Sequence, residues 1–346
     1  MNKNTLPLIE TEQELEKVLS RPSSETIKTI SKLKGDIIIL GISGKMGPTL
    51  AKLIKQAVND AGVNKKVIGV ARFSSSEIKK ELENLGIKTI TCDLLDEKAV
   101  KKLPDVSNVI FMAGMKFGST GNEYLTWAIN CYLPAIIAKK YRNSKIVAFS
   151  TGNVYSMMPV NSKGSKETDI PGPLGEYAQS CLGRERIFQY FSSKYKTPIV
   201  LIRLNYANEL RYGVLLDIAQ KVYNKKALDL SMGYANVIWQ GDANNITVQS
   251  FDICKSPANI LNLTGSEKLS IRDIANTFGK IFNKKPIYKS KESRTALLSN
   301  TEKCHKLFKQ PKISVEQMIQ WVAHWVKVEG LTINKPTHFQ TRDGKF

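Results

Sequence analysis

The chain has 346 residues, 42% of them hydrophobic, and its 51 lysines and arginines against 31 acidic residues give a formal net charge of +20. This length exceeds that of a usual single domain, so we expect two lobes or one large domain with a cap. Because the lysines are spread along the chain and form no basic block, we interpret the charge as a solvated surface that attracts small anions, and we expect no nucleic-acid partner.

The cysteines are widely spaced, odd in number and without a C-x-x-C pair: Cys92, Cys131, Cys181, Cys254 and Cys304. This spacing argues against a disulfide framework and against a zinc site, and we expect no metal. The first residues lack an apolar signal core, and the longest apolar run, IIILGI, is too short to span a bilayer. We therefore expect a soluble, cytoplasmic protein with no membrane partner.

Residues 1–34 form a charged extension, in which TEQELEKVLS is amphipathic and Ser23 or Ser24 is a candidate N-cap for a second short helix. From Asp36 onward, short apolar runs alternate with longer helical segments. The expected strands are DIIILG, KVIGVARF, IKTITCD, NVIFMAG, KIVAFS and PIVLIRL, and the expected helices are 46–62, 75–85, 122–142 and 174–195. This alternation predicts an α/β fold of the Rossmann type, with a doubly wound parallel sheet.

The rhythm loosens beyond Asn205. We expect helices at GVLLDIAQKVY, SIRDIANTFGKIF and VEQMIQWVAHWVK, and strands at ALDLSM, NVIWQ and ANILNLTG. The chain thus divides into the extension, a dinucleotide-binding domain over 35–205, and a smaller mixed α/β substrate lobe over 206–346, with part of 236–264 returning to the large sheet. The polar tail KPTHFQTRDGKF is expected to be irregular and is a candidate cover for the cleft between the lobes, where a substrate should lie.

The segment GISGKMG places Gly41, Gly44 and Gly47 at G-x-x-G-x-x-G between an apolar strand and a helix. A tight turn in this context lets backbone N–H groups and the helix N-terminus approach a pyrophosphate without a Cβ in the way. With Lys45 and Met46, these glycines are the predicted contacts to the cofactor phosphates.

The next strand indicates which nicotinamide cofactor fits. It ends in Ala71-Arg72, whereas an NAD site usually has an acid there for the ribose, and an arginine can pair with the 2′-phosphate of NADP. We therefore expect NADP in preference to NAD. The alternative is that Arg72 is one more solvated cation.

Taken in order, these motifs resemble the extended short-chain dehydrogenase/reductase superfamily, the NAD(P)-dependent epimerase/dehydratase group. The likeness covers roughly residues 36–330 and is most specific in its first half. It implies an enzyme, and homodimers are common in this group. It also implies cofactor contacts from three further segments: Asp93 and Leu94 in CDLLD, Ala113, Gly114 and Lys116 in NVIFMAGMKFGS, and Asn130 in the helix that follows.

The catalytic positions follow from the same resemblance. AFSTGNVYS is similar to the group's S-S-x-x-V-Y-G strand end, which puts Thr151 where it would bond a substrate oxygen, and Tyr177 would exchange its proton. However, the group's Y-x-x-x-K reads Tyr177-Ala-Gln-Ser-Cys181 here, so the lysine is missing. A second Y-x-x-x-K, from Tyr190 to Lys194, comes too late in the helix and is better explained by chance.

The missing lysine changes the expected chemistry. A cation about 4 Å from a phenolate is worth on the order of 4 kcal/mol at an effective dielectric constant of about 20, and the Cys181 thiol cannot supply it. We expect Tyr177 to keep a pKa of about 10 and to act as an acid rather than a base, unless Lys116, Arg184 or the oxidised nicotinamide replaces the lost charge. The alternative is that Tyr177 and Cys181 only pack against the sheet.

The second lobe also departs from the group. PIVLIRLNYANELRYG retains Asn205, but ANVIWQGDAN lacks the arginine with which nucleotide-sugar enzymes usually hold a diphosphate. Asn153, Asn205, Trp239 and Gln240 suit hydrogen bonding and stacking on a polyhydroxylated group. The alternative for Trp239 is a core aromatic. We expect an NAD(P)-dependent oxidoreductase acting on a sugar-like or small hydroxy/carbonyl substrate. A nucleotide-sugar epimerase or dehydratase and a redox-silent NADP-binding regulator are the alternatives.

Overall fold

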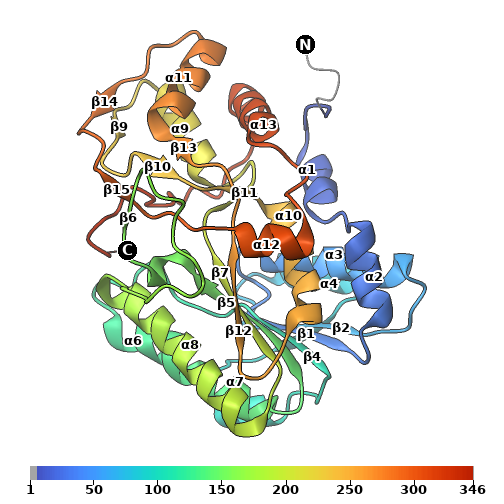
Figure 1. Ribbon diagram of the computed structural model, residues 1–346. Helices are drawn as coiled ribbons and strands as arrows, with labels where there is room; N and C mark the ends of the chain where they lie inside the picture. Colours follow the sequence, from blue (N-terminus) through green and yellow to red (C-terminus); the bar gives the residue numbers. More distant parts are fainter. Residues whose placement is uncertain (1–5, 346) are drawn as a thin grey trace.

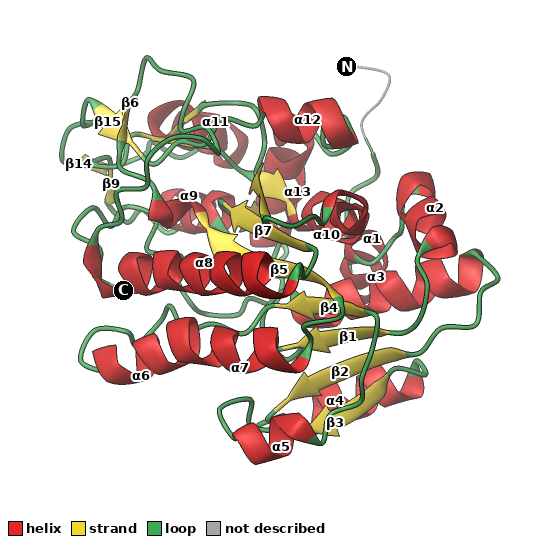
Figure 2. Ribbon diagram, turned by 60° about the horizontal axis from the view of Figure 1, so that its bottom comes forward, coloured by secondary structure: helices red, strands yellow, loops and turns green. Residues whose placement is uncertain are grey.

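A computed structural model describes residues 6–345 and has a parallel sheet of seven strands at its centre (Figure 1; Figure 2). The strand order is β12-β7-β5-β4-β1-β2-β3, and every neighbouring pair is parallel. The strands are β1 (Ile37–Leu40), β2 (Val67–Ala71), β3 (Lys88–Thr91), β4 (Asn108–Phe111), β5 (Lys145–Thr151), β7 (Ile199–Leu204) and β12 (Asn259–Leu263). This arrangement confirms the predicted Rossmann-type class.

Helices cover both faces of the sheet (Figure 2). The central strands β1 and β4 are buried along their whole length, as expected for strands that are covered on both sides. One face carries α5 (Glu97–Lys101), α6 (Glu123–Trp127), α7 (Leu133–Lys140) and α8 (Gly175–Tyr195); the other carries α2 (Ser24–Lys32), α3 (Gly47–Asp60), α4 (Ser76–Asn84), α10 (Gln240–Gln249) and α12 (Glu302–Phe308).

The helix expected over 122–142 is interrupted. Between α6 and α7 the chain forms a π turn, η1 (Ala128–Tyr132), before Pro134 in the first turn of α7. Proline has no N–H to donate to the carbonyl of Asn130, four residues earlier, so the helical ladder is broken there. As a result, Asn130 lies in the widened turn and is fully buried.

The smaller lobe lies above the sheet in Figure 1 and packs around α9 (Val214–Tyr223), α11 (Ile271–Phe282) and α13 (Val315–Lys327). The strands expected at ALDLSM and NVIWQ shrink to two residues each. The short elements are η2 (Gly152–Val154), β6 (Met158–Pro159), β8 (Ala207–Asn208), β9 (Leu228–Asp229), β10 (Tyr234–Ala235), β11 (Ile238–Trp239), η3 (Ser250–Ile253), β13 (Leu269–Ser270), β14 (Tyr288–Lys289) and β15 (Thr295–Ala296). Helices α10 and α12 were not predicted, because α10 lacks an apolar stripe at helical spacing and α12 is only seven residues long.

The N-terminal extension forms the two expected helices. Thr11 caps α1 (Glu12–Leu19) in a capping box, and Ser23 caps α2. Leu15 and Leu19 of α1 pack into the core of the smaller lobe, whereas Ile30 of α2 packs against the sheet. The extension therefore connects the two lobes.

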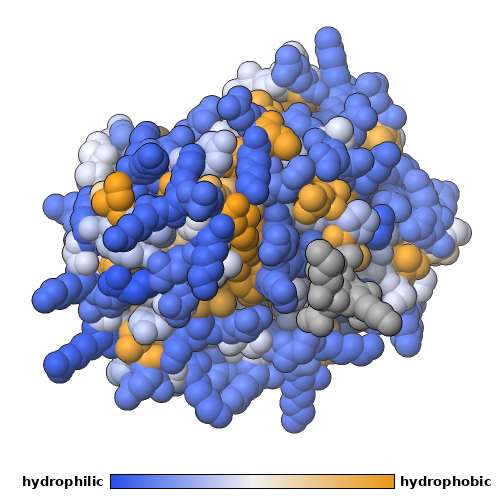
Figure 3. Space-filling model, turned by 90° about the horizontal axis from the view of Figure 1, so that it is seen from above, coloured by the Kyte–Doolittle hydropathy of each residue, from blue (hydrophilic) through white to orange (hydrophobic). Residues whose placement is uncertain are grey.

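The face seen from above is mostly hydrophilic, with hydrophobic side chains in a narrow strip and a few small patches (Figure 3). Within residues 6–345, no helix combines the length and the apolar character that a membrane crossing requires.

Candidate functional site

The three glycines of GISGKMG have different surroundings. Gly41 has φ +89°, and a Cβ there would lie 2.7 Å from the Ala113 nitrogen. A Cβ at Gly47 would lie 2.0 Å from the carbonyl oxygen of Ile42. A Cβ at Gly44 would approach only the Gly41 carbonyl oxygen, at 3.4 Å. Gly41 and Gly47 thus shape the turn, and Gly44 presents open backbone at the N-terminus of α3, as a pyrophosphate contact requires.

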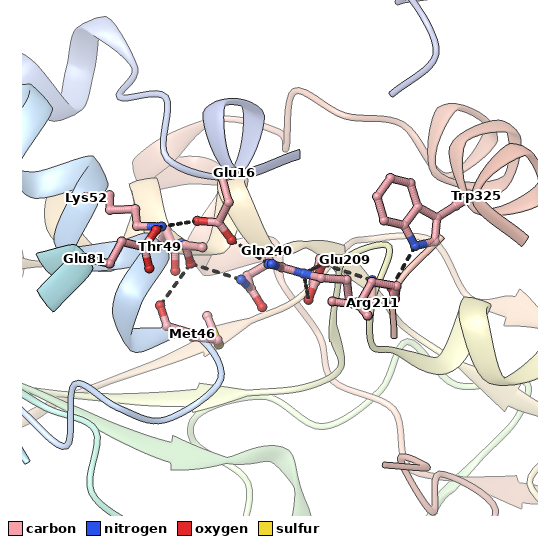
Figure 4. Close-up of polar contacts among 11 residues, drawn as sticks. Glu16, Met46, Thr49, Lys52, Glu81, Glu209, Arg211, Gln240 and Trp325 are labelled. Atoms are coloured by element: carbon pink, nitrogen blue, oxygen red, sulfur yellow. Dashed lines mark hydrogen bonds and ion pairs between the residues drawn. The ribbon is translucent and has the colours of Figure 1, made fainter. Parts of the chain in front are cut away.

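Residues of α10 and α3 support the turn (Figure 4). Gln240 donates from Nε2 to Thr49 Oγ1 at 3.1 Å, and Thr49 donates to the Met46 carbonyl at 3.0 Å. Gln240 also lines the cleft between the sheet and the smaller lobe. A residue expected to contact the substrate therefore also holds the glycine turn in place.

An ion-pair network joins the extension to both lobes (Figure 4). Glu16 of α1 pairs with Lys52 of α3 at 2.6 Å and with Arg211 at 2.7 Å, and Arg211 also pairs with Glu209 at 3.1 Å. Burial raises the pKa of Glu209, and the Arg211 guanidinium opposes that rise. The network fixes the segment that carries Tyr212 against the glycine turn.

A first cavity, of about 350 Å³, opens beside the ends of β1 to β4. Arg72 and Asp93 lie on its rim, at the ends of β2 and β3. Its lining brings together most of the residues predicted to hold the cofactor: Gly41, Gly44, Arg72, Asp93, Leu94, Ala113 and Gly114. We call it the adenosine cavity, because Arg72 and Asp93 at strand ends are residue types that can contact the adenosine half of a dinucleotide in this class of fold.

A second cavity, of about 550 Å³, continues from the first and shares Gly41, Gly44 and Gly114 with it. It lies between the sheet and the smaller lobe. The predicted site residues on its lining are Lys45, Met46, Lys116, Thr151, Asn153, Tyr177, Asn205 and Gln240. The glycine turn, the Thr–Tyr pair and the residues expected at the substrate thus share one cleft.

Thr151 and Tyr177 meet in this cleft. Thr151 is the last residue of β5. Its Oγ1 accepts hydrogen bonds from the Asn153 backbone N–H at 3.2 Å and from Asn153 Nδ2 at 3.0 Å. The Thr151 side chain also forms a hydrogen bond with Tyr177. Burial raises the pKa of Tyr177 well above its usual value; the adjacent Cys181 adds to the rise, and Arg184 and Thr151 oppose it. The expected pKa of about 10 is therefore too low. The inferred protonation state of Tyr177 does not change, because a higher pKa also makes it a neutral phenol at neutral pH.

Cys181 occupies the lysine position and is completely buried, in contact with Val154 and Tyr155. Two cations lie near Tyr177: Arg184, on the same helix, opposes the rise in its pKa, and Lys116 approaches from another segment. Lys116, in the loop after β4, places its Nζ 5.8 Å from the centroid of the Tyr177 ring, and burial lowers the pKa of Lys116 to about 8. The amine is therefore mostly charged at neutral pH.

Arg184 lies behind the cleft on α8. Its guanidinium donates to the Phe149 carbonyl at 2.9 Å and to Asn130 Oδ1. Asn130 in turn accepts from the Met115 N–H at 3.0 Å and donates to the Met115 carbonyl at 2.9 Å. Arg184 and Asn130 thus brace the loop that carries Lys116.

The structure corrects the expectation for Trp239. Its side chain is 2% exposed, lies in the core of the smaller lobe and packs against Trp321 with ring centroids 5.1 Å apart. It is therefore a core aromatic and does not stack on a ligand in the cleft.

The cleft lining also includes residues that sequence reasoning missed, among them Tyr206, Tyr212, Lys335 and Thr337. Lys335 and Thr337 belong to the irregular C-terminal tail, which does cover the cleft. The two tyrosines lie within PIVLIRLNYANELRYG, the segment that retains Asn205. Their position after Asn205 was the one signal that could have indicated them.

A glycine turn on a doubly wound parallel sheet, joined to a Thr–Tyr pair in one cleft, defines a dinucleotide-binding protein of the Rossmann class. A model of the NAD dependent epimerase/dehydratase family matches residues 37–208. The chain belongs to this family of enzymes, which confirms the resemblance seen in the motifs.

Solved structures of similar fold include UDP-glucose 4-epimerase from Thermotoga maritima, with 16% identity, a TM-score of 0.68, and coverage of 84% of this chain and 98% of that one. A dTDP-glucose 4,6-dehydratase from Bacillus anthracis has 16% identity, a TM-score of 0.70, and coverage of 85% and 97%. UDP-glucuronic acid 4-epimerase from Bacillus cereus has 18% identity, a TM-score of 0.68, and coverage of 84% and 99%. At these identities the likeness shows the fold alone. No curated protein sequence matches the chain significantly.

Proposed function

We propose that the protein is an NAD(P)-dependent redox enzyme of the epimerase/dehydratase type that acts on a sugar-like substrate. The observation that carries this proposal is the shared cleft, in which Thr151 and Tyr177 lie beside the open backbone of Gly44. The nicotinamide, when bound, would exchange a hydride with a substrate carbon.

Thr151 and Tyr177 would handle the substrate oxygen. Thr151 is 6% exposed and held by Asn153, so its hydroxyl has a fixed position for a hydrogen bond. Tyr177, protonated at neutral pH, would donate its phenolic proton to a carbonyl oxygen as that carbonyl is reduced to an alcohol. The reverse direction needs a phenolate and should be slower.

Lys116 would supply the cation that Cys181 does not. Its amine favours the phenolate electrostatically from across the cleft, without the i, i+4 spacing on one helix that the family uses. We assign Lys116 as a positioning residue that lowers the cost of deprotonating Tyr177.

We infer that NADP is preferred over NAD. Arg72 lies on the rim of the adenosine cavity, where a 2′-phosphate would be within reach of a guanidinium. Ser75 caps α4 and so is engaged with the backbone of its own helix.

A nucleotide-sugar substrate remains the second candidate. It is favoured by the family and by the solved epimerases and dehydratase that share the fold. A redox-silent, cofactor-binding role is the third candidate, and the packing of Tyr177 and Cys181 against Val154 and Tyr155 supports it.

A homodimer and a cytoplasmic location complete the proposal. Helices α6 and α8 lie side by side (Figure 2). Together with η1 they expose the aromatic side chains Tyr124, Trp127, Tyr132 and Tyr190. Such a patch suits association with a second copy. All five cysteines are unpaired thiols, which fits a reducing compartment.

The test measures turnover with a panel of UDP-sugars, aldoses and ketoses in the presence of the nicotinamide cofactor. Absorbance detects oxidoreduction, and chromatography detects epimers. Turnover that is lost in Tyr177→Phe would support the proposal. Tight cofactor binding without any turnover across the panel would favour the redox-silent role.

A further inference from the structure

Lys45 of the glycine turn points across the cleft toward the smaller lobe. Its Nζ lies 3.2 Å from the centroid of the Tyr212 ring and 4.3 Å from that of Phe117. Two aromatic faces therefore hold the amine in one place. This orientation takes the charge away from the adenosine cavity, whose lining does not include Lys45.

The Lys45 amine is buried, and the charges of Asp217 and Glu209 offset only part of the effect of burial on its pKa. Its Nζ has no hydrogen-bond partner among the described residues. Burial, together with the charges of Lys116 and Lys335, lowers the pKa of Lys45 to about 7. A buried donor that finds no acceptor destabilises the folded protein unless a ligand supplies one.

The described residues that line this cleft include three lysines, Lys45, Lys116 and Lys335, and no aspartate or glutamate. The nearest carboxylates are already engaged. Asp217 accepts from the Thr337 N–H at 2.9 Å and from its hydroxyl at 2.6 Å, and Glu209 pairs with Arg211. The described lining of the cleft therefore carries a net positive charge that no neighbouring carboxylate neutralises by a direct ion pair.

The C-terminal tail brings Lys335 to the cleft. Thr337 is tied to Asp217, Phe339 is 1% exposed in the core of the smaller lobe, and Arg342 donates to the Thr295 carbonyl at 2.7 Å. The tail is thus anchored on the C-terminal side of Lys335, an exposed residue that lines the cleft.

We propose that Lys45 and Lys335 form an anion subsite that binds a phosphate or carboxylate group of the substrate. This inference rests on the proposed function, since it adds a charged group to a sugar-like substrate. The anionic group could be the diphosphate of a nucleotide-sugar or a substituent on the sugar itself. In either case the subsite replaces the arginine that the smaller lobe lacks at ANVIWQGDAN.

The test is titration calorimetry of the full chain, with and without saturating NADP⁺. The probes are UDP for the diphosphate, glucose 6-phosphate and glucuronate for a charged sugar, and glucose as the neutral reference. The variants are Lys45→Gln and Lys335→Gln. Lys345→Gln, an exposed lysine of the same tail outside the cleft, is the matched control.

We expect at least one anionic probe to bind at least tenfold more tightly than glucose, and each cleft variant to weaken it about tenfold while Lys345→Gln leaves it unchanged. If the cleft variants weaken the binding of UDP alone, the anionic group is the diphosphate. If they weaken the binding of the charged sugars, the anionic group is the sugar substituent. Anion affinities that are equal to that of glucose, or unchanged in both cleft variants, would overturn the proposal.

Two outcomes separate this inference from the proposed function. If Lys45→Gln lost NADP⁺ affinity while anion binding without cofactor stayed intact, Lys45 would serve the cofactor and the subsite would be refuted. If the wild-type chain bound no cofactor but its lysine-dependent anion binding persisted, the subsite would stand and the proposed redox function would fail.

Discussion

The glycine turn and the start of α8 lie in the same cleft, but they differ in how closely they keep the family pattern. At the turn, a Cβ on Gly41 or Gly47 would collide with backbone atoms, so the sequence must supply glycine. At α8, the tyrosine is kept while Cys181 replaces lysine, and Lys116 approaches from the loop after β4. A backbone cradle depends on local sequence, whereas a positive charge can come from any segment that reaches the same place.

The largest expected effect tests the catalytic side of this comparison. Removing the hydroxyl in Tyr177→Phe should lower turnover by roughly 10²- to 10⁴-fold, the usual contribution of a general acid, and leave cofactor affinity unchanged. The measurement is kcat beside a calorimetric Kd for NADP⁺.

Tyr190→Phe is the matched control, because Tyr190 is exposed on the same helix and contacts Lys194. Equal activity in the two variants would mean that Tyr177 transfers no proton.

The next effect tests whether Lys116 replaces the missing lysine. A charge about 6 Å away contributes roughly 2 to 3 kcal/mol at an effective dielectric constant of about 20, so Lys116→Gln should lower kcat for alcohol oxidation roughly 10- to 100-fold. The wild-type pKa of about 8 predicts that this contribution is present below pH 8 and is lost as the pH rises through it. Lys116→Arg should restore activity and remove that dependence. A pH profile that is the same in wild type and Lys116→Gln would contradict the assignment.

A smaller effect tests the cofactor side. Arg72→Ala should weaken NADPH about tenfold by removing a charge-assisted hydrogen bond, and should leave NADH unchanged. Lys80→Ala, at an exposed cation on α4, is the control. If both cofactors weakened equally or neither changed, Arg72 would be only a solvated cation.

The smallest effect is on stability. The pKa of Lys45, about 7 in the folded protein, lies below the value of about 10.4 expected for an unfolded lysine. The charged amine therefore opposes folding fully below pH 7, and this effect shrinks as the pH rises toward the unfolded value. Lys116 and Lys335 lower this pKa, and Asp217 and Glu209 raise it.

Lys45→Met should accordingly gain on the order of 1 kcal/mol over wild type at pH 6, after solvent screening, and lose that advantage near pH 10. Chemical denaturation at the two pH values measures this difference. A change in stability that is the same at both values would indicate that packing between Phe117 and Tyr212 dominates.

The fold was predictable because its signals are local. Three of these signals depend on residues that are near one another in sequence: the alternation of strands and helices, the helix cap at Ser23, and the glycine turn. Helix α10 was missed because it is buried on nearly every side and carries polar residues such as Gln240 and Asn244, which bond Thr49 of α3. Its sequence therefore shows no stripe of apolar residues at helical spacing.

The site was predictable only in part. The cofactor cavity gathers residues from strand ends, and parallel topology alone brings those ends together. The positions of Trp239 and Lys335 depend on tertiary packing. Trp239 sits beside Trp321, and Lys335 reaches the cleft because Phe339 and Arg342 anchor the tail. Such long-range contacts leave no periodic signal in the sequence.

The most direct measurement is calorimetric titration of NADP⁺ and NAD⁺ into wild type and Gly44→Asp. The aspartate side chain has room, so folding should be unaffected, but its charge would face the cofactor phosphates. We expect one cofactor per wild-type chain and binding at least roughly 100-fold weaker in an equally stable Gly44→Asp. If a folded wild-type chain takes up neither cofactor, or if the variant binds as tightly as wild type, the glycine turn does not hold a dinucleotide.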